Sequence, residues 1–423
     1  MGRASPRAAA LKWLAALALG WQVVLGAGPA AGQTVFDKEN VGVQDRPRPE
    51  YEPIGIRAGA FVVHPEIAVS AAGNDNVTAS QVQALTDAVF AVHAQVAVKS
   101  DWDQNAVSLS ASTALTGHAA YPKLNAEEHR VSAAGVLDVR HDLTVDGEAA
   151  LARQYISPAS DAYLGSPLSP LFFSQASARI GAAEELTHIR LTTDFKFDNF
   201  TYSDGVTARG RPISESFRDR DTYKVDIRGD YAVSPALGVF VEQTFAHNDY
   251  NRAKFRDQNS EETLVGPKFE ITNLLTGELA VGYLSSSFSD RRAKREDTVH
   301  WRGKVVYYAT PLIDITLSAR EGFFDSGVPN SPAYLNKNAE IRVDYELLRN
   351  LIITGSFTGD WNEYRAIDRH DHYYDARFGA TYLANRGMEL NLVFNRLTRS
   401  SSGALATTRL ADDVLTLTLT LKA

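Results

Sequence analysis

The sequence of 423 residues contains no cysteine. No disulfide can therefore stabilise this protein, and no thiolate is available as a nucleophile or a metal ligand. The sequence also lacks a hydrophobic run near the roughly 20 residues that a helix needs to cross hydrocarbon. Positive charge is in deficit, with 43 basic against 51 acidic residues. That balance argues against a nucleic-acid partner, because nucleic acid is itself negatively charged.

Catalytic motifs are missing as well. Serine, aspartate and scattered histidines are present, but none is spaced as a nucleophile with an oriented base, and no glycine-rich phosphate loop occurs. The cluster His370-Asp371-His372 could in principle hold a metal. In a strand, however, the two histidines share one face and Asp371 points to the other. We therefore expect no catalytic residue, no metal site and no cofactor.

The first 32 residues have the composition of a secretory signal peptide. Three basic residues precede a short apolar stretch from Trp13 to Leu25, and small residues follow at 26–32. The apolar stretch is too short for a membrane anchor. Removing residues 1–32 leaves 40 basic and 51 acidic residues, so the formal net charge becomes −11. Cleavage fits equally well after Ala30, Ala31 or Gly32.

The remaining chain has a regular spacing of turns. Between residues 234 and 386, compact turns recur 36 to 39 residues apart, at Ser234-Pro235, Asn273-Leu274, Thr310-Pro311, Arg349-Asn350 and Asn385-Arg386. Each interval holds two segments of about ten residues that alternate apolar and polar side chains. This period of two excludes a helical or leucine-rich solenoid. It is typical of an all-β, antiparallel, up-and-down transmembrane β-barrel.

The alternation also assigns faces. Around 338–347 the odd positions are apolar and the even positions from 340 to 346 are charged, and the segments 222–231 and 191–198 alternate in a similar way. An Arg or Lys that faces lipid at the midplane costs about 2 to 4 kcal/mol, so the charged sets must face a polar lumen. The residues expected to line the lumen are Asp194, Lys196, Lys224, Asp226, Arg228, Glu340, Arg342 and Asp344.

We expect a signal peptide at 1–32, a Pro-rich periplasmic arm at 33–58 and a barrel at 59–423. About eighteen strands fit, or sixteen if the hairpin around 176–190, where Glu184 and Glu185 interrupt the alternation, does not form. The expected strands are 59–71, 87–99, 105–117, 128–140, 142–154, 176–188, 190–202, 220–233, 236–249, 261–272, 275–288, 297–309, 312–323, 338–348, 350–362, 372–384, 387–398 and 411–421.

Turns after even-numbered strands are short and should face the periplasm, whereas loops after odd-numbered strands are longer and should face outward. The longest outer loop, about 155–175, is unusually apolar and rich in proline. We expect it to fold into the lumen and narrow the channel, although packing on neighbouring loops or on a second subunit explains its composition equally well. The residues of this expected constriction are Pro167, Pro170, Phe172 and Phe173.

A resemblance to a known family begins at residues 41–77. The segment Asp45-Arg46-Pro47-Arg48-Pro49-Glu50-Tyr51 is followed by Gly55-Ile56-Arg57-Ala58-Gly59-Ala60-Phe61 and by Asn74-Asp75-Asn76-Val77. With the barrel pattern, these motifs resemble the bacterial outer-membrane family described as putative β-barrel porin 2. The resemblance implies the outer membrane of a Gram-negative bacterium and a porin-like role, and some relatives are encoded beside exopolysaccharide genes.

The sequence thus predicts a porin-like channel for passive diffusion of small hydrophilic solutes. The alternative is a barrel component of exopolysaccharide export or surface attachment. Expected partners are outer-membrane lipid, lipopolysaccharide near the basic loop Arg291 to Arg295, the barrel-assembly machinery, and small solutes or polysaccharide. The last strand ends in Lys422-Ala423 where an aromatic residue is usual, which weakens the assembly signal.

Overall fold

The protein is described as a computed structural model that covers residues 41–79, 84–160, 169–206, 212–293, 295–407 and 409–423. The expected signal peptide at 1–32 lies outside these residues. The described chain belongs to one compact unit, Thr34–Ala423. Among the residues described, no helix is long and apolar enough to cross a membrane.

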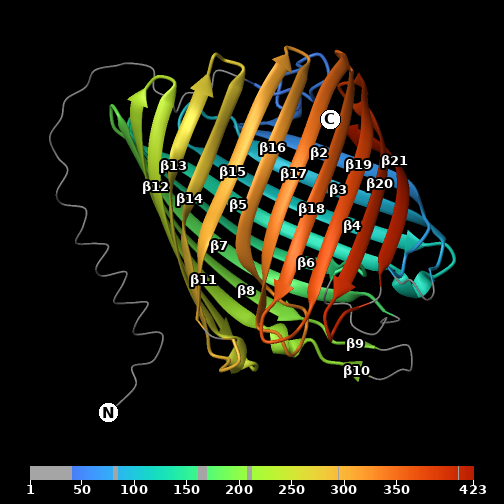
Figure 1. Cartoon of the computed structure of the whole chain (residues 1–423). Coiled ribbons are helices and arrows are strands. Elements are labelled where there is room, and N and C mark those ends of the chain that lie inside the picture. Colours follow the sequence, from blue (N-terminus) through green and yellow to red (C-terminus); the bar gives the residue numbers. More distant parts are fainter. Residues whose placement is uncertain (1–40, 80–83, 161–168, 207–211, 294, 408) are drawn as a thin grey trace. The chain divides into compact units, whose positions relative to one another are not determined.

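Eighteen long antiparallel strands form the wall of the barrel (Figure 1). They are β2 (Phe61–Asn74), β3 (Asp87–Ser100), β4 (Ala106–His118), β5 (Ala126–Arg140), β6 (Leu143–Ile156), β7 (Leu171–Glu185), β8 (Ile189–Tyr202), β11 (Arg220–Ser234), β12 (Leu237–Tyr250), β13 (Gln258–Ile271), β14 (Leu275–Phe288), β15 (Glu296–Thr310), β16 (Ile313–Asp325), β17 (Ala333–Leu348), β18 (Leu351–Tyr364), β19 (His370–Asn385), β20 (Met388–Ser402) and β21 (Leu410–Lys422).

Closure is made by the first and last long strands. β2 pairs with β3 on one side and with β21 on the other, so Ala68 lies opposite both His93 and Thr420. A closed ladder satisfies the backbone hydrogen bonds of every strand without an exposed edge, which is what hydrocarbon demands. The expected all-β barrel of eighteen strands is confirmed, including the hairpin of β7 and β8.

Short elements complete the described chain. They are β1 (Ile56–Ala58), the pair β9 (Gly205–Val206) and β10 (Pro212–Ile213), and the 3-10 turns η1 (Pro122–Leu124), η2 (Ser216–Arg218) and η3 (Lys254–Arg256). β1 turns back into β2 through Gly59, whose φ of +64° is a conformation that glycine adopts without strain.

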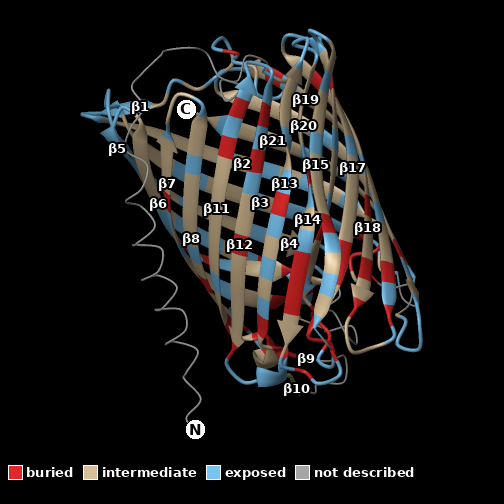
Figure 2. Cartoon of the chain, turned by 60° about the vertical axis from the view of Figure 1, so that its left-hand side comes forward, coloured by how far each residue is buried: buried red, intermediate tan, exposed pale blue. Residues whose placement is uncertain are grey.

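Alternating side chains explain why these segments form strands. On β17, for example, Ile341 is 43 % exposed on the outward face, while its neighbour Arg342 points inward and bonds to Asp344. Figure 2 shows exposed and partly exposed residues over most of the strand surface. Large exposed apolar side chains on strands would be unfavourable in water, but in a bilayer they face lipid.

The two ends of the barrel differ as expected. Turns of two or three residues, such as His141-Asp142 and Arg349-Asn350, lie at the end where the C-terminus lies, and longer loops lie at the other end (Figure 1). We call these the short-turn end and the long-loop end. Two strand starts were wrong: β7 begins at Leu171 and β17 at Ala333, each five residues before its expected start, so the loops that precede them are shorter than predicted.

Candidate functional site: the barrel lumen

The register places the expected lumen residues on one face of the wall. Lys196 pairs with Lys224 and Asp194 with Asp226, and Arg228 continues the same face of β11. On β17, Glu340, Arg342 and Asp344 lie opposite Thr358, Ser356 and Thr354 of β18. The residues that alternate with them along the strands point outward, and they include exposed apolar side chains such as Leu191 and Tyr223. The geometry agrees with the predicted lumen lining, which stays a prediction until it is probed.

One side of the lumen is filled by an ion-pair network. Arg228 of β11 contacts Asp230 at 2.6 Å and Glu278 of β14 at 2.8 Å, and Arg302 of β15 contacts Glu242 of β12 at 2.8 Å. These charge-assisted bonds span several strands of a concave surface. The guanidinium of Arg228 also lies 3.9 Å from the ring centroid of Phe240.

An apolar cluster lies beside this network. Phe240, Leu264 and Ala280 pack together and are almost fully buried, although their parity places them on the inner face. Strand alternation predicts a polar side chain at such positions. The stacking of Arg228 on Phe240 explains the exception, because the guanidinium shields the ring from water.

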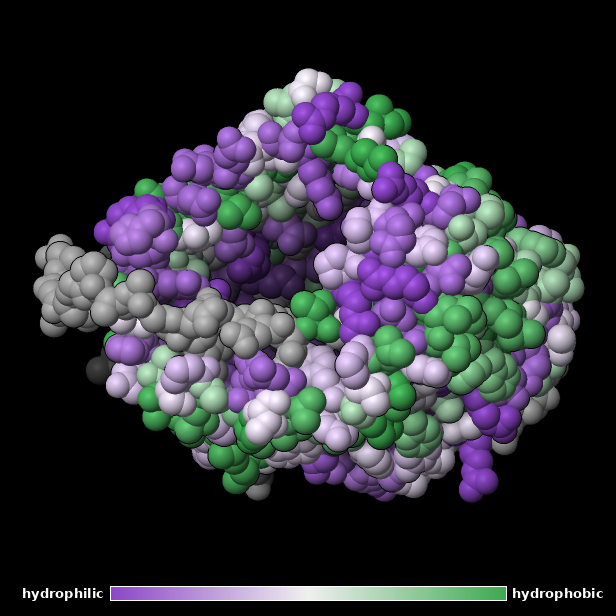
Figure 3. All heavy atoms as spheres, turned by 90° about the horizontal axis from the view of Figure 1, so that it is seen from above, coloured by the Kyte–Doolittle hydropathy of each residue, from purple (hydrophilic) through white to green (hydrophobic). Residues whose placement is uncertain are grey.

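The opposite side of the lumen carries several short side chains beside longer ones such as Gln95 and Arg130. On β2 to β5 and β21 the inner face carries Ser70, Ala91, Ser110, Ser132 and Thr418, and the hydroxyls of Ser110 and Ser132 lie 2.8 Å apart. Serine, threonine and alanine take up little space, so this wall leaves room for water. Seen from the short-turn end, Figure 3 shows a hollow lined by hydrophilic residues. We call the inner face of β2 to β5 and β21 the small-residue wall.

At the long-loop end, the β16–β17 hairpin separates from β15. β15 and β16 pair as far as Arg302 and Arg320, whereas β16 and β17 stay paired to the end of β16. Beyond Arg320, the side of β16 that should face outward packs on inner-face residues of other strands. Phe323 packs edge to face on Phe288 of β14, with ring centroids 5.7 Å apart. The hairpin end therefore leans across the lumen.

Asp325 holds the leaning hairpin in place. Its carboxylate lies 2.8 Å from Arg256, 3.2 Å from Arg220 and 3.3 Å from Arg218, and it accepts a hydrogen bond from the hydroxyl of Tyr250. Arg256 is fully buried, and it also donates to the backbone carbonyls of the turn that follows β16. Sequence reasoning missed this anchor, because its partners are 69 to 107 residues away from Asp325 in the chain.

The expected constriction loop is placed only in part. Its described start reaches the far wall, where Arg399 of β20 donates to the carbonyl of Ala159 at 3.4 Å. Pro170 immediately precedes β7, and Pro167 lies outside the described residues. The assignment of Phe172 and Phe173 to the loop needs correction, because both belong to β7.

These two phenylalanines pack on opposite faces of the wall. Phe172 lies under Arg153, whose guanidinium is 4.0 Å from the ring centroid, and Phe173 stacks on Tyr202 at 5.5 Å. Together with Tyr202, Leu171 and Ile156 form a buried cluster. The strand extends to Leu171 because this apolar packing continues the ladder, which local composition alone did not reveal.

The N-terminal arm folds back into the lumen at the short-turn end. The backbone N–H of Val43 donates to Asp314 at 2.7 Å, Gln44 donates to Asp344 at 2.8 Å, and Arg48 contacts Glu346 at 2.9 Å. These acceptors lie on the inner face of β16 and β17. We expected an extended periplasmic arm at 33–58; residues 43–48 lie against the inner face of the wall at the short-turn end, and the periplasmic location of the arm stays a prediction. The sequence signal for this docking is limited to Arg46 and Arg48, two cations in an arm that precedes strands rich in inward carboxylates.

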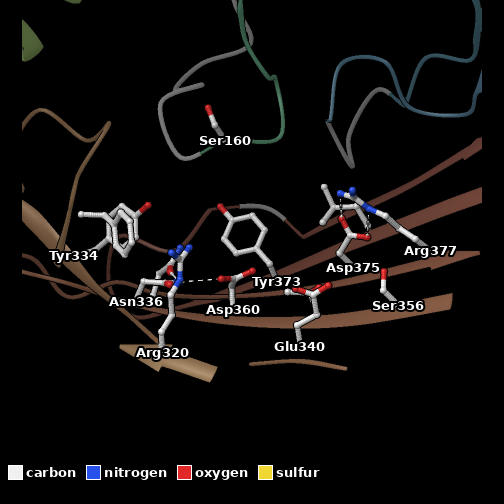
Figure 4. A pocket seen from close by; sticks show the side chains of 14 residues that line it. Ser160, Arg320, Tyr334, Asn336, Glu340, Ser356, Asp360, Tyr373, Asp375 and Arg377 are labelled. Atoms are coloured by element: carbon white, nitrogen blue, oxygen red, sulfur yellow. Dashed lines mark hydrogen bonds and ion pairs between the residues drawn. The ribbon is translucent and has the colours of Figure 1, made fainter. Parts of the chain in front are cut away.

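A cavity of about 480 Å³ opens under the leaning hairpin (Figure 4). It is bounded by β16 to β20 and by the start of the β6–β7 loop. Its lining combines three aromatic rings with planar polar and charged side chains, and Figure 4 shows them converging on one space. The lining includes Arg320, Phe324, Tyr334, Asn336, Glu340, Asp360, Tyr373, Asp375 and Arg377.

Other candidate residues have structural partners. Asp371, in the histidine cluster, is buried and held by Arg369 at 2.5 Å and by Ser401 at 2.6 Å. In the basic loop, Arg292 pairs with Asp290 at 2.7 Å, and this hydrogen bond lowers the pKa of Asp290. Within the described residues no cluster of three or more metal-binding side chains occurs.

Comparison with known proteins gives a family match. A family model described as "Putative beta-barrel porin 2" matches residues 48–423. The outer membrane protein OpdK from Pseudomonas aeruginosa is similar at a TM-score of 0.47 and 10 % identity, over 85 % of this chain and 99 % of that chain. For OccAB3 from Acinetobacter baumannii the TM-score is 0.48 at 10 % identity, over 86 % and 100 %. No curated protein matches the chain.

Proposed function

The chain belongs to the putative beta-barrel porin 2 family, and we propose that it acts by letting small hydrophilic solutes diffuse passively across the outer membrane. The observation that carries this proposal is a closed barrel of eighteen strands with a hydrophilic inner face. Barrels of 16 to 18 strands leave an aqueous channel unless inward elements fill it. The family is one of porins, so the proposed role is transport without a catalytic step.

The proposed path for solutes follows the small-residue wall. The ion-pair network around Arg228, the leaning hairpin and the docked arm all occupy the side from β11 to β18. The opposite wall carries short side chains such as Ser110 and Ser132, together with longer ones such as Arg130, which pairs with Glu148 of β6. The channel is therefore narrow and placed to one side of the barrel axis, which suits small solutes better than bulky ones.

The direct test is conductance of the purified full-length protein in planar bilayers. We expect stepwise ion currents from the unmodified protein. Ser110→Trp should reduce the step size, because the indole projects into the path. Leu109→Trp is the matched control: it is the next residue on the same strand, 50 % exposed on the lipid face, and should leave conductance unchanged. A folded barrel without current, or equal effects of the two variants, would contradict the proposed path.

Export and assembly belong to the same proposal. Residues 1–32 direct the chain through the inner membrane, and the barrel-assembly machinery inserts it with its long loops outward. The loops then meet lipopolysaccharide, with the exposed Arg292 and Arg295 available to phosphate groups. Separation of outer and inner membranes, followed by protease treatment of intact cells, tests location and orientation together.

The alternative, export of an exopolysaccharide, requires a wider path. A polymer would have to displace both the Asp325 anchor and the docked arm, because the two lie at opposite ends of the lumen. Genes for polysaccharide polymerisation beside this gene would favour that role. A stable conductance that is insensitive to loss of such genes would favour the general channel.

A further inference from the structure

We propose that the cavity under the β16–β17 hairpin binds an uncharged saccharide of a few sugar rings on its way through the channel. This inference rests on the proposed function and adds a substrate class to it. The cavity volume of about 480 Å³ lies within the range of small-molecule sites, about 300 to 1,000 Å³. It is formed at the long-loop end, so a solute arriving from that side meets it before the small-residue wall.

The aromatic rings supply apolar platforms. Phe324 and Tyr334 stack on each other with centroids 6.0 Å apart at the tip of the leaning hairpin, and Tyr373 faces the cavity from β19 (Figure 4). Sugar rings have one or two faces made of C–H groups, and such faces pack on aromatic rings with little loss of hydration. The aromatic rings flank the cavity from two directions, which suits a flat, ring-shaped solute.

Planar polar side chains supply the complementary hydrogen bonds. Asn336 and Asp360 are bonded to each other at 3.0 Å, and Asp375 accepts from Arg377 at 2.8 Å. Carboxylates, amides and guanidinium groups each offer two neighbouring polar atoms in one plane. Neighbouring hydroxyl groups of a sugar present donors and acceptors at a matching separation, so one such side chain can bind two hydroxyls.

The mixture of positive and negative lining residues points to an uncharged ligand. Arg377 is neutralised by Asp375, and Asp360 is held by two asparagines. Of the charged lining residues, Arg320, Glu340 and Asp360 make no ion pair with any residue that the structure describes. The unpaired lining residues are thus one cation and two anions, so charges of both signs face the cavity. A charged solute would meet repulsion either from Arg320 or from the two carboxylates, whereas a neutral polyhydroxylated solute can use all three side chains as hydrogen-bonding groups.

The first measurement is binding, which does not depend on conduction. Maltotriose, cellotriose and mannotriose are titrated into the full-length protein in detergent, with calorimetric detection. We expect at least one of them to bind, and triethylene glycol and a galacturonic acid trimer to bind at least tenfold more weakly. Equal binding of the glycol, or stronger binding of the acid, would overturn the proposal, as would absence of binding by all three sugars.

Two substitutions in the cavity and one on the lipid face test where the sugar binds. Tyr373→Leu and Glu340→Gln should each weaken sugar binding at least tenfold. Tyr374→Leu, which alters the lipid-facing neighbour of Tyr373, should leave binding unchanged. Unchanged binding in both lumen variants, with heat-modifiable migration proving that they fold, would place the sugar elsewhere and refute the site.

The same sugars are then added to single channels in planar bilayers. Binding in the cavity predicts brief current blockages that disappear in Tyr373→Leu, while the open conductance in salt alone persists. If the sugar binds but no current is ever seen, the channel proposal fails and the binding site stands. If current is normal and no sugar binds, the site fails and the channel stands.

Discussion

The hydroxyl of Tyr250 donates a hydrogen bond of 2.6 Å to the carboxylate of Asp325, although the two residues lie on strands β12 and β16, four places apart in the wall. Neighbouring strands are about 4.8 Å apart, so a contact across four places along the wall requires one strand to leave it. The contact between Tyr250 and Asp325 therefore shows that the end of the β16–β17 hairpin leans into the lumen.

Asp325→Ala should release this hairpin. The substitution leaves Arg218, Arg220 and Arg256 close together without their shared carboxylate, and removing one partner of a buried ion pair costs about 3 to 5 kcal/mol. We expect a larger single-channel conductance with the barrel still folded. Asp297→Ala, at an exposed carboxylate, is the control. A folded Asp325→Ala protein with unchanged conductance would show that the hairpin does not narrow the channel.

Docking of the N-terminal arm should depend on pH through Glu50. A hydrogen bond from its own backbone N–H and one from Arg349 lower the pKa of Glu50. A lowered folded-state pKa stabilises the docked arm above the ordinary glutamate pKa of about 4.3, and this contribution is lost as pH falls through the lowered value. The arm should thus stay docked at pH 5 or above and loosen at a lower pH than an unpaired glutamate would require.

A single fluorophore measures this docking, since the chain has no cysteine of its own. Tyr51→Cys carries the label, and its anisotropy is followed during acid titration. In Glu50→Gln the titration step should shrink or shift, while the contacts of residues 43–48 keep the arm docked at neutral pH. An identical titration curve in the two proteins would assign the step to another group.

The two faces of β17 can be tested by a pair of substitutions. Val343 lies on the outward face opposite Ile315 and Gly355, whereas Arg342 bonds to Asp344 inside. Val343→Arg should reduce the yield of folded barrel, because a lipid-facing Arg near the midplane costs about 2 to 4 kcal/mol. Arg342→Val should be tolerated better. Equal yields, or the opposite order, would reverse the assignment of faces.

Deletion of residues 159–170 tests the predicted constriction loop. Ala159 at the start of this loop accepts a hydrogen bond from Arg399 on the far wall, so the deletion removes at least one contact across the lumen. We expect higher conductance and an intact folded yield, because Ile156 and Leu171 already pair at the strand ends. Arg399→Gln should have a smaller effect in the same direction. Unchanged conductance in the folded deletion protein would place the loop outside the channel.

Much of the fold was predictable from local sequence. The alternation around Arg342 and Arg228 identifies strands and faces, and the short turns at His141-Asp142 and Arg349-Asn350 set the pairing of neighbours. These features depend on residues close in the chain. The start of β7 at Leu171 was missed because its pairing is favoured by packing on Tyr202, which lies 31 residues later.

Contacts across the lumen could not be predicted from local sequence. The alternation of β16 places Asp325 on the outward face, yet the structure brings it to Tyr250 and Arg256, and the inward Asp344 receives the arm residue Gln44. The sequence by itself determined which segments become strands and which side of each meets lipid, because both follow from a period of two and from neighbouring pairs. Only the tertiary structure decided which inward groups meet, because that depends on how the closed barrel curves and on where a strand leaves its neighbour.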